Sequence, residues 1–172
     1  YEAQAKRLGK AYPMTFADNA LGFRSGNPKP CGTPDDILAQ GKRFYEALSP
    51  ETGEFFNTML DNELLDVLST PGKRAGGYCT SLGDYKVPFI FANFNGTQHD
   101  VEVVTHEAGH AFAAWLNRDR IPQSYIWPSL EACEVHSMSM EFFAWPWAEG
   151  FFGEDTRKFR YSHLAGALTF IP

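Results

Sequence analysis

The pentapeptide HEAGH, which runs from His106 to His110, constrains the fold more than any other stretch of the chain. The surrounding sequence predicts a helix from about Asp100 to Leu116. On a helix, residues four apart lie on one face, with Cβ atoms roughly 5–6 Å apart. Both histidine rings can therefore turn a nitrogen toward the same metal ion.

Glu107 lies between these histidines, about 100° around the helix from His106. Its carboxylate is therefore expected beside the metal rather than on it, which is the position of a general base acting on water. Imidazole and carboxylate ligands in a tetrahedral shell suit zinc, so one Zn²⁺ ion is the expected cofactor. A third protein ligand is still needed. No histidine follows His110 in the xxGxxH form that is typical of metzincins.

A second acidic helix offers that ligand. Residues 129–145, SLEACEVHSMSMEFFAW, begin at a possible Ser129 cap and are expected to stay helical until Pro146. Three glutamates fall within roughly 80° of one another on a helical wheel: Glu131, Glu134 and Glu141. Their face also holds Met138 and Trp145, which favours a metal ligand with supporting carboxylates over a solvated surface. The alternative is an acidic rim on an otherwise buried helix.

The two motifs together resemble the thimet oligopeptidase/oligoendopeptidase F family of zinc metallopeptidases. In that family the third zinc ligand opens an E-x-x-S-x-x-x-E pattern, which implies Glu134 as the ligand and Glu141 as the downstream acid. Glu134 follows the last histidine of HEAGH by 24 residues. The stretch from residue 71 to 115 also resembles the oligoendopeptidase branch, and the likeness covers roughly residues 10–172.

The resemblance implies a mainly helical fold with a deep channel, one zinc ion, and cleavage of short peptides. It also implies a substrate aligned along an edge strand before the zinc helix, which would be Phe89 to Phe94. An exposed edge can hold an extended peptide through main-chain hydrogen bonds. The expected peptide contacts are Ala92, Asn93 and Phe94, with Gly77 and Tyr78 at the border of the cleft. The alternatives are a buried strand with Asn93 in a turn, and ordinary packing for Tyr78.

Ligand histidines usually donate their second N–H to a carboxylate or a carbonyl. Glu131 and Glu141 are the expected partners. Glu102, one turn before His106, is a further candidate, although it is equally compatible with an exposed helix glutamate. His136 falls on a different helix face from Glu134 and is expected to be packed or solvent-facing rather than a ligand.

The chain also departs from the family. The transition-state groups, a histidine and tyrosines on a later loop, are expected after Pro172, and His163 does not match them by position. The long amino-terminal helical half is missing. The chain therefore resembles the catalytic core of a larger enzyme, whose missing parts are expected partners, and alone it is expected to bind zinc but to catalyse poorly. The alternatives are a metallocarboxypeptidase of related fold and a catalytically incomplete zinc- or peptide-binding fragment.

The remaining sequence predicts one α+β domain, mainly helical with a small sheet. Prolines and glycines make residues 1–33 an extended lead-in to a core of residues 34–172. Helix starts are expected at caps on Thr33, Ser49 and Asp155. The first of these helices is expected to reach about Leu48, and apolar positions carry the second to Leu68. Segments 76–81 and 88–94 are the expected strands.

Composition excludes several classes of protein. A net charge of −6 without a basic block disfavours a nucleic-acid partner. The longest apolar runs are too short to cross a bilayer, so no membrane partner is expected. Three widely spaced cysteines (Cys31, Cys79 and Cys133) disfavour a disulfide framework and favour a reducing compartment, so a cytoplasmic location is expected.

Overall fold

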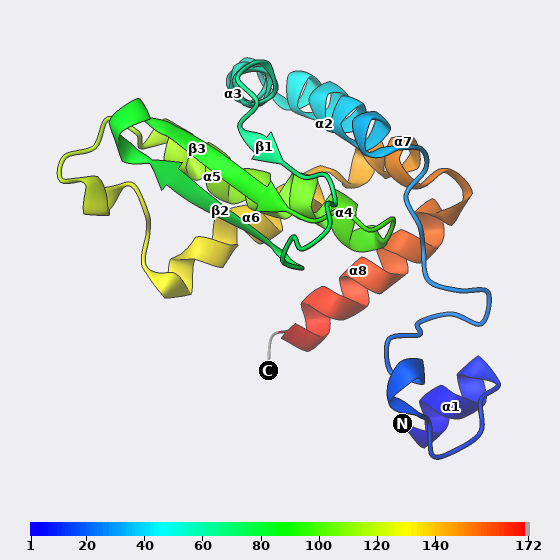
Figure 1. Cartoon of the computed structure of the whole chain (residues 1–172). Helices are drawn as coiled ribbons and strands as arrows, with labels where there is room; N and C mark the ends of the chain where they lie inside the picture. The colour runs from blue at the N-terminus through cyan, green and yellow to red at the C-terminus, as the bar shows by residue number, and fades with distance from the viewer. Residues whose placement is uncertain (171–172) are drawn as a thin grey trace.

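Two helices that meet at a serine form the first layer of the core (Figure 1). In the computed structural model, which describes residues 1–170, α2 spans Pro34–Leu48 and α3 spans Pro50–Asp61. The side chain of Thr33 accepts the backbone N–H of Asp36, whose carboxylate accepts the N–H of Thr33. Ser49 forms the same reciprocal pair with Thr52. Both predicted helix starts are confirmed, and each capping box satisfies two N–H groups that would otherwise lack partners.

The second helix is shorter than its apolar pattern predicts. It ends at Asp61, and Glu63 adopts a positive φ of 53°, which a right-handed helix cannot continue through. The chain then enters β1 (Leu65–Asp66), so the expectation that this helix extends to Leu68 is wrong. Short apolar runs fit a helix or a strand equally well, and here the left-handed residue decides between them.

The sheet has the order β1-β3-β2. β2 (Gly77–Leu82) runs antiparallel to β3 (Val87–Ala92), which confirms both predicted strands, and β1 pairs with β3 in parallel at Ile90 and Phe91. β3 is therefore the central strand. The prediction that the segment from Phe89 to Phe94 forms the exposed edge is wrong, because β2 occupies that position.

The motif helix has three parts: α4 (Gln98–Glu102), a π-helical turn η3 (Val103–Glu107) and α5 (Ala108–Leu116). The helix begins at Gln98, two residues before the predicted start at Asp100, and the carboxylate of Asp100 does not cap it. This carboxylate accepts the backbone N–H groups of Asn95 and Gly96 and so shapes the loop that precedes the helix.

The π turn includes the first two residues of the motif, His106 and Glu107, and a neighbouring helix supports it. The buried hydroxyl of Tyr45 in α2 donates to the carbonyl of Val104 at 3.0 Å. The hydroxyl of Thr105 donates to the carbonyl of Val101. These bonds satisfy carbonyl groups in and just before a turn whose regular helical pattern is interrupted.

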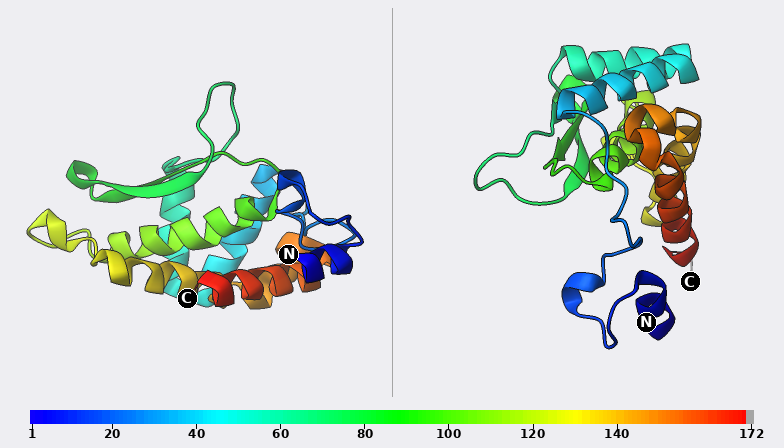
Figure 2. Two further views of the ribbon diagram at one scale, coloured as in Figure 1. Left: turned by 90° about the horizontal axis from the view of Figure 1, so that it is seen from below. Right: turned by 90° about the vertical axis from the view of Figure 1, so that its right-hand side faces the viewer.

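The carboxyl-terminal helices cover the far side of α5. Seen edge-on in Figure 2 (left), the sheet, α5, and then α6 with α8 follow one another as layers. α6 spans Leu130–Phe143, α7 spans Ala148–Phe152 and α8 spans Thr156–Phe170. The predicted helices after Ser129 and Asp155 are thus confirmed, although α6 stops before Pro146 and α7 was not foreseen.

The core between α2, α3, β3, α5 and α7 is rich in aromatic side chains. The largest fully buried side chains include Phe44, Tyr45, Phe55, Phe56, Phe151 and Phe152. The ring of Tyr45 stacks on Phe56 with centroids 4.5 Å apart. Because Tyr45 also bonds the π turn, this core fixes the position of the motif helix.

The amino-terminal segment lies to one side of the core (Figures 1 and 2). The expectation that residues 1–33 are extended is wrong for α1 (Glu2–Leu8) and for a short 3₁₀ turn at Phe16–Asp18. The guanidinium of Arg24 donates to the carbonyl of Arg7 at 2.6 Å, which satisfies the end of α1. Across residues 1–170, no helix combines the length and apolarity that a membrane crossing requires.

Candidate metal centre

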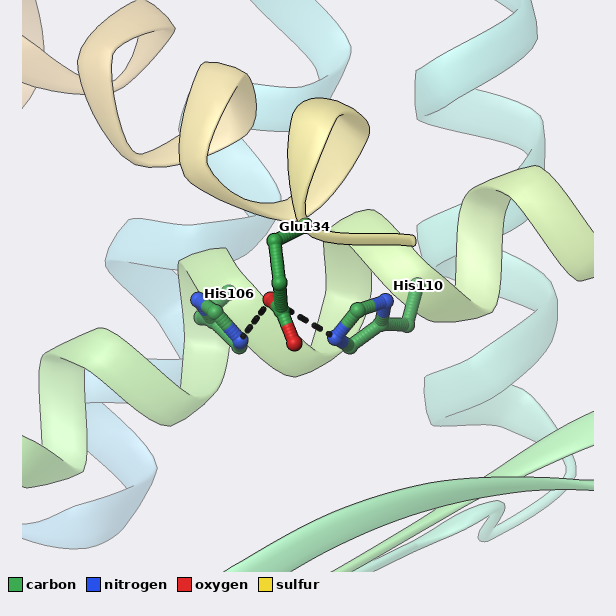
Figure 3. A group of neighbouring side chains, drawn as sticks. All are labelled: His106, His110 and Glu134. Atoms are coloured by element: carbon green, nitrogen blue, oxygen red, sulfur yellow. Dashed lines mark ion pairs between the residues drawn. The ribbon is translucent and has the colours of Figure 1, made fainter. Parts of the chain in front are cut away.

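Three side chains from two helices converge at the motif (Figure 3). Nε2 of His106, in the π turn, lies 3.1 Å from Oε2 of Glu134 in α6. Nε2 of His110, in α5, lies 3.5 Å from the same oxygen. The two imidazole rings are 4.9 Å apart and nearly perpendicular. Within residues 1–170 these three form the group whose ligand atoms all lie within 4.8 Å of one another.

These distances fit a shared zinc ion. Ligand atoms at about 2.0–2.2 Å from a tetrahedral Zn²⁺ are themselves about 3.4 Å apart. Three atoms with lone pairs facing one another also need a positive charge between them, because unpaired acceptors repel. A proton can satisfy one pair, whereas a divalent cation satisfies all three. The donor set of two imidazoles and a carboxylate is that of a zinc site with an open position.

The second helix can approach because the motif contains a glycine. A Cβ on Gly109 would lie 2.8 Å from the Cα of Ser137 and 3.1 Å from the carbonyl oxygen of His136. Both atoms belong to the backbone of α6 and cannot move away independently. Gly109 therefore permits the contact between α5 and α6 that carries Glu134 to the histidines.

Replacing Gly109 by alanine is expected to lower the free energy of unfolding by about 1–2 kcal/mol, because overpacking costs about 1–3 kcal/mol and alanine's better helix propensity offsets part of it. The matched control is Gly166→Ala in α8, where an added Cβ meets nothing within 4 Å. The control is expected to be neutral or slightly stabilising. Chemical denaturation measures both, and equal effects would contradict the proposed close contact.

Glu107 lines the same cleft as His106 and Glu134. Burial raises the pKa of its carboxyl above the ordinary value, against the nearby positive charge of His106 and a backbone hydrogen bond from Cys79, which both lower it. Cys79 belongs to β2, the edge strand. Burial and the charge of Glu107 together raise the pKa of the Cys79 thiol to about 12, so it remains protonated at neutral pH. A carboxylate with a raised pKa is suited to accepting and releasing a proton.

Glu141 contacts the first histidine, which is the contact that its predicted role requires. Its Oε1 lies 2.5 Å from Nδ1 of His106. Burial raises the pKa of Glu141, but the hydrogen bonds from His106 and His163 outweigh burial and lower it to about 2. The carboxylate is therefore ionised at neutral pH. It leaves the opposite ring nitrogen of His106 free to face Glu134.

A cleft of about 590 Å³ opens at the cluster, between the motif helix and the pair α6 and α8. Carboxylates line much of it, including Glu102, Glu107, Glu134 and Glu141. Glu102 accepts a hydrogen bond from Gln98 at 2.5 Å and lies 3.5 Å from His99. The structure therefore places Glu102 in the cleft but gives it other partners than the ligand histidines.

The family assignment follows from the comparisons with known proteins. The model of Peptidase family M3 matches residues 43–158, more than half of the chain. The chain belongs to Peptidase family M3. The resemblance seen in its motifs is thereby confirmed, and the α+β fold agrees with that of the solved relatives.

Three relatives show how much of an M3 protein the chain represents. A candidate oligoendopeptidase F from Bacillus anthracis str. Ames superimposes with a TM-score of 0.93 at 53% identity, over 99% of this chain and 31% of that one. PZ peptidase A with an inhibitor gives a TM-score of 0.92 at 52% identity, over 99% and 30%. Oligopeptidase PepF of Bacillus subtilis (strain 168) is 30% identical over 95 residues, 55% of this chain and 14% of the relative. The chain thus spans less than a third of these relatives.

The residues predicted to hold a peptide occupy two different environments. Ala92 is fully buried and Phe94 is 5% exposed, so both side chains belong to the core. The amide of Asn93 donates to the carbonyls of Lys73 and Arg74 and so anchors the loop that leads into β2. Gly77 and Tyr78 lie on β2 itself, at the exposed edge of the M3 sheet.

Tyr78 is 53% exposed and its ring stacks on Phe91 at 5.2 Å. The sequence alone did not distinguish the central strand from the edge strand, because both runs are apolar and bounded by similar turn residues. A strand lies at the edge when only one neighbouring strand pairs with it, and the pairing of β1 with β3 joins residues that are distant in the sequence.

The other residues considered around the candidate metal centre differ in whether they contact it. Glu131 is exposed, and its carboxylate interacts with Ser129 at the start of its own helix rather than with the histidines. His136 was expected to be packed or solvent-facing rather than a ligand; it is half-buried, and its Nε2 lies 3.2 Å from Nδ1 of His110. His163 contacts Glu141 from α8. The transition-state groups expected after Pro172 lie outside the described residues.

Local patterns gave no signal for these two histidines. The spacing between Glu134 and His136 places them on different faces of α6. Both side chains nevertheless contact histidines of the motif helix. His163 reaches the site only because α8 folds back along α6, which is a tertiary feature.

Proposed function

We propose that this chain forms the catalytic centre of a zinc-dependent oligoendopeptidase that hydrolyses internal bonds of short peptides. The observation that carries the proposal is the convergence of His106, His110 and Glu134, with the carboxylate of Glu107 beside them at the edge of the sheet. Membership of family M3 supports the reaction class.

The three converging side chains would hold the zinc ion. When bound, zinc supplies a Lewis acid that lowers the pKa of water and polarises a carbonyl group. Glu107 takes a proton from the attacking water and delivers it to the leaving amine. Glu141 keeps the ring of His106 oriented and unprotonated at Nε2 by accepting its Nδ1–H.

The peptide would lie along β2 as an added strand. Because β3 occupies only one side of β2, the other side presents backbone groups that an extended peptide can pair with. The influence of the Cys79 backbone on the pKa of Glu107 supports a base close to this edge. Main-chain pairing brings the scissile bond near the base with little dependence on the peptide's sequence.

Removing zinc with 1,10-phenanthroline is expected to abolish hydrolysis of a quenched fluorescent peptide by the intact protein, and stoichiometric zinc is expected to restore it. Restoration by magnesium or calcium instead would contradict the ligand set, because those ions prefer oxygen ligands. Mass spectrometry of the products separates the alternatives. Two internal fragments support an endopeptidase, whereas stepwise loss of single carboxyl-terminal residues would establish a carboxypeptidase.

A further inference from the structure

A buried histidine outside the ligand cluster is connected to it through Glu141. His163, in α8, is 6% exposed, and its Nε2 contacts Oε2 of Glu141. The other oxygen of the same carboxylate contacts Nδ1 of His106. One carboxylate thus joins a candidate zinc ligand in the motif helix to a residue of the last helix.

Trp145 determines the direction of the hydrogen bonds that connect His163, Glu141 and His106. Its indole nitrogen lies 2.9 Å from Nδ1 of His163, and an indole can only donate. Nδ1 of His163 must therefore accept, so the ring's proton sits on Nε2 and is donated to Glu141. The second oxygen of Glu141 then accepts the Nδ1–H of His106. As a result, Nε2 of His106 presents its lone pair to the ligand cluster.

The ring of His163 is also held in place by aromatic neighbours. Its centroid lies 4.8 Å from that of Phe142 and 5.5 Å from that of Phe159, which stacks on it at 25°. Trp145 closes a third side, with centroids 5.7 Å apart. The imidazole therefore has both a fixed orientation and a fixed donor atom.

We propose that His163 is a positioning residue for the metal centre. It orients Glu141 so that this carboxylate holds His106 in the tautomer and rotamer that bind zinc, and it thereby raises the zinc affinity of the site. The inference rests on the proposed function, since it presupposes that the cluster binds zinc. It also couples the docking of α8 to metal binding.

Zinc affinity of the intact protein, measured by competition with a chromophoric chelator, tests the proposal. His163→Leu fills the space without a donor and is expected to weaken zinc binding by about tenfold, the lower limit for loss of an outer partner. His163→Gln carries a donor and an acceptor on one amide. It is expected to restore the affinity to within about threefold of the wild type, since one imperfect neutral hydrogen bond accounts for no more.

Two further variants separate positioning from packing. Trp145→Phe keeps an aromatic ring but removes the indole donor, and it is expected to weaken zinc binding by about two- to threefold. Thr156→Val removes the hydroxyl that donates to the carbonyl of Gly153 at the start of α8. This hydroxyl takes no part in the hydrogen bonds that connect His163, Glu141 and His106. The substitution is expected to lower the Tm without changing the zinc affinity.

The outcomes are distinct. A wild-type protein without zinc binding would overturn both the proposed function and this inference. Tight wild-type binding with unchanged affinity in His163→Leu would overturn the inference alone. The same holds if His163→Gln loses as much affinity as His163→Leu, because packing would then explain both. If His163→Leu does not fold, unchanged affinity in Trp145→Phe overturns the proposal, and a two- to threefold loss supports it.

Discussion

Replacing Glu107 by glutamine is expected to lower kcat/KM for peptide hydrolysis by about 10²–10⁴-fold, which is what a positioned general base contributes. The amide keeps the size of the side chain and can still contact the backbone of Cys79, but it cannot accept and release a proton at neutral pH. Zinc content is expected to stay at the wild-type value, because Glu107 is not part of the ligand cluster.

The matched control for this variant is Glu131→Gln, which makes the same change on an exposed residue. Because the carboxylate of Glu131 interacts with Ser129 and not with the histidines, activity is expected to remain unchanged. Turnover by Glu107→Gln at the rate of the control would remove the base assignment. Loss of zinc from Glu107→Gln would instead assign this residue to the ligand shell.

Replacing His106 by alanine is expected to abolish stoichiometric zinc binding. The substitution removes one of three protein ligands and leaves Glu134 facing a single imidazole at 3.5 Å. It also leaves the buried carboxylate of Glu141 without its contact to Nδ1. The loss of affinity is expected to exceed the roughly 10–100-fold that accompanies loss of an outer partner.

Elemental analysis of the purified variant measures the effect directly. His99→Ala is the control, because His99 borders the same cleft but interacts with Glu102 instead of the ligand cluster. One zinc ion per chain is expected in the control. Equal zinc content in the two variants would contradict the ligand assignment, and with it the proposed function.

The helix starts and the motif geometry could be predicted because they depend on neighbours in the sequence. Capping at Thr33 and Ser49 involves residues three positions apart, and the two histidines of the motif lie four apart. The end of α3 could not be predicted in this way. Leu64 continues a helical pattern, but the backbone reverses its handedness at Glu63 and the next residues join the sheet.

The sequence by itself determined the two histidines and the glutamate of HEAGH, since their spacing is local, and the resemblance of the second motif singled out Glu134. The packing of α6 against α5 then brings Glu134 to the histidines. The tertiary structure alone decided that β2 is the edge strand, that Glu131 is exposed, and that His136 and His163 contact residues of the site. Those outcomes depend on which strand lacks a second ladder partner and on how α6 and α8 pack against the motif helix. Such contacts join residues far apart in the chain, and no local pattern encodes them.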